Sequence, residues 1–244
     1  MCGAKYDSVT DQAPSTEGEV SAEGSAGASR AGGSTLRDRA AWVTLLVTIA
    51  LSLGLDLGSK AAAFRYVAGR PVEVVREHVL EVSKSDPRMV TTLVPLHDAR
   101  VVVPEVLHFT LVLNPGAVFG IGPGKRWFFV GFTGLALAFG LGVFGLWTKP
   151  RDRMAHVGIG LLIGGGLGNL YDRLVYGCVR DFLHPLPGWE WPGGRKFMGT
   201  SEVWPYVSNV ADKWLLIGIA ILLVHAWRMG GQEHKKGPAT PPAP

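Results

Sequence analysis

The stretch that decides the fold is WFFVGFTGLALAFGLGVFGLW (127–147), followed by TKPRDR (148–153) and MAHVGIGLLIGGGLGNLY (154–171). Each of the two apolar runs is close to the length that a helix needs to cross the hydrocarbon core of a bilayer. The connection between them is short and carries one lysine and two arginines. Short basic connections stay on the cytoplasmic side of a membrane. The stretch therefore predicts one helix that enters the cytoplasm and a second helix that leaves it.

Two more segments, Ala41 to Leu57 and Val210 to Trp227, have the length and apolar composition of membrane helices. The basic loop then fixes the topology: both chain ends are cytoplasmic, and the long segment from Phe64 to Arg126 lies outside. The whole chain is 47% hydrophobic and only 18% charged, which is more apolar than a soluble domain requires. We expect a multi-pass membrane protein with four helices.

Composition also limits the partners and cofactors. The net charge of +4 forms no basic stripe with interleaved aromatic residues, so nucleic acid is not an expected partner, and the excess is assigned to charges that orient the helices. Membrane lipids are expected to surround the helices. Cys2 and Cys178 are the only cysteines, and no Cys/His cluster has metal-ligand spacing. We expect neither a metal nor another cofactor.

The chain divides into three parts. Residues 1–36 and 230–244 are predicted to be disordered tails, because small polar residues bury too little apolar surface to offset the entropy of ordering. Residues 37–229 form the membrane domain. Its outer segment at about 70–122 alternates or clusters β-forming residues in VEVVREHVLEV (72–82), RVVVP (100–104) and LHFTLVL (107–113), which indicates short strands in a small sheet. A second outer loop spans about 174–208. The expected fold is thus mainly α, a bundle of four membrane helices with a small extracytoplasmic β-cradle.

Four ionisable residues fall at one level of this membrane domain, near its outer face: Asp56, Lys60, Asp172 and Asp212. Ionisable groups near membrane depth are costly and by default indicate a functional site. Asp56 and Lys60 are four residues apart on one helix face. Mutual neutralisation and a role in orienting substrate are both consistent with that pair.

Asp172 and Asp212 have no evident basic partner on their own helix faces. Two carboxylates in a partly desolvated site tend to share a proton. The ionised one can take a proton from an attacking water while the protonated one donates to a scissile carbonyl oxygen. Asn169 and Asn209 each lie three residues before one of these acids, on the same helical face. The pattern predicts an aspartic-protease pair formed by Asp172 and Asp212.

Several blocks resemble lipoprotein signal peptidase, also called signal peptidase II, a family of bacterial aspartyl proteases. DLGSK (56–60) is similar to the family's D-x-x-x-K, and NPGAVFG (114–120) resembles its N-x-G-A segment. GGGLGNLYDRLVYGCVRDF (164–182) resembles the G-N-x-x-D-R block with the V-x-D-F that follows it, and WPYVSNVAD (204–212) resembles the block that opens the fourth helix. The chain departs from the family pattern at Ser208, where phenylalanine commonly precedes the asparagine, and in two longer outer segments, 60–114 and 173–209.

The resemblance implies a specific enzyme. It would be an aspartic endopeptidase of the bacterial inner membrane, with its active site near the outer face. It would remove signal peptides from prolipoproteins by cutting on the N-terminal side of a cysteine that carries diacylglycerol. Asp172 and Asp212 would be catalytic, and the residues supporting substrate or the site would be Asp56, Lys60, Asn114, Gly116, Asn169, Arg173, Asn209 and Ala211. The resemblance also implies an outer helix near the loop between the third and fourth spans.

Two other classes of function compete with this interpretation. A proton- or ion-coupled carrier also uses acids inside the membrane, but it predicts acids distributed across the membrane depth and an inverted repeat. A noncatalytic scaffold would use the acids only to pair with Lys60 or Arg173. Loss of either acid would then harm folding rather than turnover.

Overall fold

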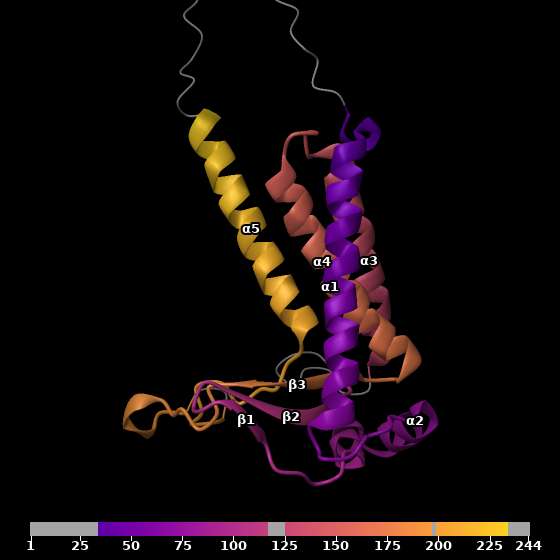
Figure 1. The fold of residues 1–244 in the computed structure, drawn as a ribbon, viewed down its shortest axis with the longest axis vertical. Coiled ribbons are helices and arrows are strands. Elements are labelled where there is room, and N and C mark those ends of the chain that lie inside the picture. Colours follow the sequence, from indigo (N-terminus) through magenta and orange to yellow (C-terminus); the bar gives the residue numbers. More distant parts are fainter. Residues whose placement is uncertain (1–33, 117–124, 197–198, 234–244) are drawn as a thin grey trace, which may run out of the picture. The chain divides into compact units, whose positions relative to one another are not determined.

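The computed structural model describes residues 34–116, 125–196 and 199–233. Its regular elements form four long helices, a small sheet, and several short helices (Figure 1). In chain order these are η1 (Thr35–Arg37), α1 (Arg39–Tyr66), α2 (Arg76–Ser85), η2 (Pro87–Leu93), β1 (Arg100–Val103), β2 (Leu107–Asn114), α3 (Arg126–Leu146), α4 (Arg153–Val175), β3 (Val179–Pro185), η4 (Pro192–Gly194) and α5 (Val210–Glu233).

The helices α1, α3, α4 and α5 are each long and apolar enough to cross a membrane, which confirms the prediction of a multi-pass membrane protein. Three of them begin and end within a few residues of the predicted spans. Helix α1 is the exception, because it continues past Leu57 to Tyr66. Asp56 and Lys60 do not end it, since both side chains are fully buried and partnered on its inner face. Paired charges can therefore lie inside the helix.

Helix α4 packs against the three other long helices, and glycine makes this possible. An added Cβ at Gly160 would lie 2.7 Å from the Cβ of Thr48 on α1, and one at Gly164 would overlap the Ser52 hydroxyl. On another face of α4, a Cβ at Gly165 would lie 2.7 Å from the backbone oxygen of Ala211 on α5. The glycines of α4 thus serve helix packing, since small residues let neighbouring backbones approach closely.

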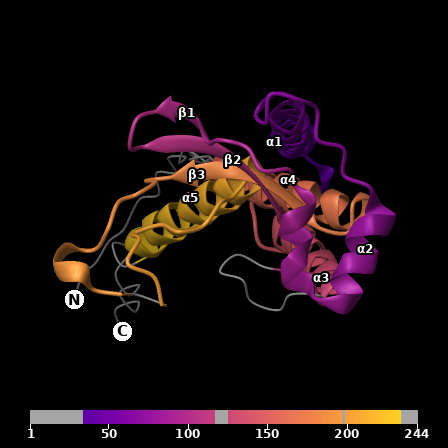
Figure 2. The same cartoon turned by 90° about the horizontal axis from the view of Figure 1, so that it is seen from below.

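The sheet is antiparallel, with strand order β1-β2-β3, and lies with α2 at one end of the long helices (Figures 1 and 2). Its register pairs Asn114 with Val179 and Val112 with Asp181. One side of the sheet packs with α2 and the end of α1 around a core that includes Phe64, Val79 and Leu113. This core holds β3 across the ends of α1 and α4.

Three expectations for the outer segments need correction. Residues 72–82 contain most of helix α2 rather than a strand, because Val79 and Val82 recur at helical spacing and pack into the core of the sheet. Strand β3 was not predicted within the loop 174–208. The described part of that loop contains β3 and the short η4, whereas the outer helix α2 follows α1. Residues 117–124, part of the predicted β-cradle, lie outside the described ranges.

Candidate active site

One group of charged residues connects α1, α4 and β3 below the surface. The Nζ of Lys60 lies 2.8 Å from Asp56 Oδ2 and 3.3 Å from Asp172 Oδ2. The Arg180 guanidinium donates to Asp172 Oδ1 through Nε and Nη2, at 3.2 and 2.9 Å. Asp56, Lys60 and Asp172 are fully buried, and Arg180 is 6% exposed. We call these four residues the salt-bridged group; it contains two positive and two negative charges.

Asp172 is held from several sides within this group. Besides the two cations, the backbone N–H of Arg180 donates to its Oδ2 at 3.0 Å. The Arg180 guanidinium also stacks over the Tyr176 ring, 4.2 Å from its centroid. Hydrogen bonds between ionised groups are stronger than those between neutral ones. Asp172 therefore anchors the end of α4 to β3.

The second group of acids is held by neutral amides. Asp212 lies in the first turn of α5, where its Oδ2 accepts from the backbone N–H of Asn209 at 3.2 Å, while Asn209 Oδ1 accepts from the backbone N–H of Asp212 at 3.1 Å. This reciprocal arrangement is a capping box. The other carboxylate oxygen of Asp212, Oδ1, accepts from the side-chain amide of Asn169 at 2.9 Å. The helix dipole also favours a negative charge at this end of α5.

Asp181 on β3 is the partner of Asp212. Its carboxylate accepts from the side-chain amides of Asn114, at 3.0 Å, and Asn209, at 2.6 Å. Asp181 is 2% exposed. Burial and the charge of Asp212 raise the pKa of Asp181 to about 8, against the opposing effect of the two amide hydrogen bonds. We call Asp181 and Asp212 the amide-held pair; within the described residues neither acid forms an ion pair.

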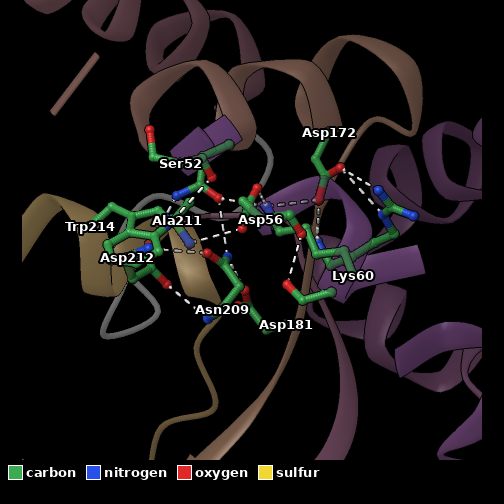
Figure 3. A network of polar contacts seen from close by, with 12 residues as sticks. Ser52, Asp56, Lys60, Asp172, Asp181, Asn209, Ala211, Asp212 and Trp214 are labelled. Atoms are coloured by element: carbon green, nitrogen blue, oxygen red, sulfur yellow. Dashed lines mark hydrogen bonds and ion pairs between the residues drawn. The ribbon is translucent and has the colours of Figure 1, made fainter. Parts of the chain in front are cut away.

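Asn169 connects the two groups, whose four carboxylates are seen together in Figure 3. Its Oδ1 accepts from Lys60 Nζ at 3.1 Å and from the Asn209 amide at 3.0 Å, while its Nδ2 donates to Asp212. A second connection runs from the backbone N–H of Ala211, which donates to Asp56 Oδ1 at 2.8 Å. Four elements, α1, α4, α5 and β3, thereby fix the positions of all four carboxylates.

Arg173 lies beside the amide-held pair without binding it directly. Its Nη1 donates to the backbone oxygen of Asn169 at 3.2 Å and its Nη2 to that of Gly116 at 3.0 Å. The N–H of Gly116 in turn donates to Asn114 Oδ1 at 3.0 Å. The guanidinium stacks on the ring of Phe129 on α3, 5.1 Å from its centroid. Arg173 thus joins the end of β2 to α4 and adds a positive charge near Asp181 and Asp212.

A cavity of about 680 Å³ lies between α3 and α5, with α4 as its floor. Asp181 and Asp212 are both in its wall, together with Asn114, Asn169 and Arg173. The rest of the wall is largely apolar and comes from membrane-depth residues that include Phe128, Phe129, Phe132, Phe139, Leu162, Leu215 and Leu222. The cavity therefore has one polar end, which contains the amide-held pair, and a long apolar part within the helix bundle.

A comparison of the sequence with known families decides the family of the chain. Residues 48–228, more than half of the chain, match the family described as signal peptidase (SPase) II. The chain belongs to the signal peptidase II family. As a member, it is a multi-pass membrane protease that removes signal peptides from lipoproteins.

Two relatives that carry the name lipoprotein signal peptidase agree with this assignment. The lipoprotein signal peptidase of Desulfitobacterium hafniense is 36% identical over 124 residues, covering 50% of this chain and 70% of the relative. That of Halothermothrix orenii is 35% identical over 136 residues, covering 56% and 78%. A solved structure, described as a bacterial membrane enzyme determined by the in meso method, is 26% identical, with a TM-score of 0.47 and coverage of 68% of this chain and 91% of that one.

All ten residues that the sequence suggested for the signal peptidase site lie within one connected set of contacts. The expected i, i+4 pairing of Asp56 and Lys60 is confirmed. The pairing of acids differs from the prediction, however: the neighbour of Asp212 is Asp181, whereas Asp172 has Arg180 and Lys60 as partners. Asn169 likewise binds Asp212 rather than the acid three residues after it on its own helix.

Asp181 is the residue that sequence reasoning missed. It is contained in the V-x-D-F block, VRDF (179–182), which follows the G-N-x-x-D-R block. No role was predicted for it because it lies beyond the third span, in a loop whose strand was not recognised. The available signal was the acid between Arg180 and Phe182. An acid in a buried strand needs partners from other elements, so it indicates a site residue.

Proposed function

We propose that this protein is an aspartic endopeptidase that cleaves diacylglyceryl-modified prolipoproteins on the N-terminal side of the lipidated cysteine, with Asp181 and Asp212 as its catalytic pair. The observation that carries the proposal is that these two acids face one cavity and are held by shared neutral amides. Asp172, the acid suggested by the sequence, is replaced in this role because Lys60 and Arg180 bind its carboxylate and it is absent from the described cavity wall. Its proposed function is to hold β3, and with it Asp181, against α4.

The surroundings of the two acids suit them to different roles. The raised pKa of Asp181, about 8, keeps this carboxyl protonated at neutral pH. Asp212 lies at the N-terminus of α5, where the helix dipole favours a negative charge, and it accepts from the Asn209 N–H and the Asn169 amide. A pair of acids with separated roles is the arrangement that general acid and base catalysis requires.

The reaction proceeds by direct attack of water. Asp212 takes a proton from the water as its oxygen bonds to the scissile carbonyl carbon, and Asp181 gives its proton to the carbonyl oxygen. The tetrahedral intermediate then collapses: its hydroxyl proton returns to Asp181, the C–N bond breaks, and Asp212 delivers the other proton to the leaving amine. Both acids are restored to their starting states, and no covalent enzyme intermediate forms.

The shape and chemistry of the cavity support the proposed substrate. A signal peptide and a diacylglyceryl group are both apolar, and the cavity wall formed by α3, α4 and α5 is apolar over most of its length. Its volume of about 680 Å³ falls within the range typical of ligand pockets. The scissile peptide would lie at the polar end, where Asn114 and Arg173 can orient its backbone groups.

The proposed orientation follows from charge. The connection between α3 and α4, residues 147–152, carries Lys149 and Arg151 and lies at the opposite end of the helices from the sheet. Basic connections stay in the cytoplasm, so the sheet and the acids would face the outside of a bacterial inner membrane, with both chain ends inside. Residues 37–229 would constitute the peptidase domain.

The proposal is tested by cleavage of a diacylglyceryl-modified prolipoprotein by purified wild type, D181N, D212N and D172N, with the melting temperature in detergent measured for each. D181N and D212N should remain folded and lose turnover, whereas D172N should lose stability. Near-normal turnover in folded D181N or D212N would overturn the catalytic assignment. A carrier or a scaffold would be favoured if folded wild type cleaves no lipidated substrate.

A further inference from the structure

Lys213 occupies an unusual position next to the amide-held pair. It follows Asp212 in the first turn of α5, and its Nζ donates to the hydroxyl of Ser208 at 2.9 Å. Ser208 is 4% exposed and is fixed by backbone hydrogen bonds with Leu183 in both directions, at 2.8 and 2.7 Å. The ammonium group also lies 5.7 Å from the centroid of the Trp204 ring, within the range of a cation–π interaction. The side chain is therefore held in one place.

A lysine in this place is unfavourable on local grounds. The N-terminal turn of a helix carries a partial positive charge, which disfavours a cation. Lys213 is only partly exposed, and within the described residues it forms no ion pair. Lys60, by comparison, contacts two carboxylates directly. Nothing in the packing of α5 alone explains a cation here.

The nearby charges supply an explanation. The carboxylates whose charges act on Lys213 are those of Asp212 and Asp181. The other charged groups near the pair come from α1, α4 and β3: Asp56, Lys60, Asp172, Arg173 and Arg180. Arg173 stands in the cavity wall, where a substrate would contact it. Lys213 is absent from the described cavity wall, so it can act on the pair without touching a substrate.

We propose that Lys213, held by Ser208 and the Trp204 ring, is a positioning residue whose charge keeps one acid of the Asp181–Asp212 pair ionised in the pH range where the enzyme works. This inference rests on the proposed function of the pair. Lys60 also acts on Asp181, but it is bound to two carboxylates of the salt-bridged group, whereas Arg173 and Lys213 form no ion pair within the described residues. Arg173 supplies its charge from the cavity side, and Lys213 supplies it from the side of the sheet.

The proposal predicts a displaced pH–rate profile. A cation beside two acids stabilises their ionised forms, so its removal makes the pair bind protons more tightly. In K213M the profile of kcat should therefore move to higher pH by about 0.5–1 unit, a small shift because the group is partly exposed. KM should change little, and K213R should restore the wild-type profile. S208A, which frees the lysine without removing its charge, should give a smaller shift in the same direction.

The test compares kcat against pH for wild type, K213M, K213R and S208A on a diacylglyceryl-modified prolipoprotein, with melting temperatures recorded. An unchanged profile in folded K213M overturns the proposal, as does a shift that K213R fails to reverse. If K213M does not fold, the pH–rate profile of S208A is the test. An unchanged profile in folded S208A then overturns the proposal. Activity retained by D181N or D212N would instead signal failure of the catalytic assignment, so the two failures are distinguishable.

Discussion

The two groups of carboxylates differ in what surrounds them, although Asn169 touches both. Asp56 and Asp172 are bound by Lys60 and Arg180, so each charge faces an opposite charge. Asp181 and Asp212 are bound by asparagine amides and backbone N–H groups, which carry no net charge.

This difference in partners separates the acids that anchor the fold from the acids that we propose for catalysis. A cation beside a carboxylate stabilises the ionised form so strongly that a proton is rarely accepted. A neutral amide also orients a carboxylate, but it favours the ionised form less strongly than a cation does. Within the described residues we therefore assign the acids that bind cations to the fold, and we propose the amide-held pair for catalysis. The identity of the partner is more informative than the depth of burial.

Loss of an acid from the salt-bridged group should give the largest change in stability. D172N leaves the guanidinium of Arg180 buried without its anionic partner, and breaking one side of a buried ion pair costs about 3–5 kcal/mol. We expect a large drop in melting temperature, measured in detergent by the fluorescence of the tryptophans. D181N, the same substitution in the amide-held pair, is the matched control. A smaller drop in melting temperature for D172N than for D181N would contradict the difference drawn between the two groups of carboxylates.

A change in packing should affect the salt-bridged group to a lesser extent. A methyl group at Gly168 would overlap the carboxylate of Asp56, and overpacking typically costs about 1–3 kcal/mol. G168A should lower the melting temperature accordingly. G142A on α3 is the control, because an added Cβ there has nothing within 4 Å. Equal melting temperatures for the two variants would argue against the tight contact between α1 and α4.

The amide-held pair can be perturbed through Asn114. Its hydrogen bond opposes the rise in the pKa of Asp181, so N114A should raise that pKa further and move the pH–rate profile upward. A hydrogen bond to an ionised group contributes about 1.5–3 kcal/mol, which corresponds to a shift of about one to two pH units. The pH dependence of kcat measures this shift. A profile displaced downward would contradict the assigned contact.

The remaining prediction concerns stability against pH. The pKa of Asp181 rises from an ordinary value of 3.8 to about 8 on folding, so the folded protein binds this proton more tightly than the unfolded chain does. The resulting stabilisation is complete below about pH 4 and is lost as the pH rises through about 8. The melting temperature of wild type should fall across this interval. D181N should show a weaker slope, and an equal slope would exclude Asp181 as its source.

The membrane helices could be predicted from the sequence, whereas the outer elements could be predicted only in part. Long apolar runs specify membrane helices on their own, because each satisfies its backbone hydrogen bonds internally. Strand β3 depends on β2, which pairs Asn114 with Val179 across 65 positions of the chain, and no local pattern reports such a partner. Asp172 was preferred to Asp181 for the same reason. Arg180 reaches back from β3 to Asp172, and this contact exists only once the strand is in place.

The contact of Asp56 with Ala211 bears on how the protein is made. The two residues are 155 positions apart, so α1 is synthesised long before the donor of this hydrogen bond, the backbone N–H of Ala211 in α5, is available. During that interval Asp56 and Lys60 can neutralise each other within a single helix, since they are four residues apart. The same pair is then completed by Asn169 and Ala211 when the later helices arrive. The i, i+4 pair thus allows the first helix to enter the bilayer alone, and the network that holds the proposed catalytic pair forms only when the last helix has joined it.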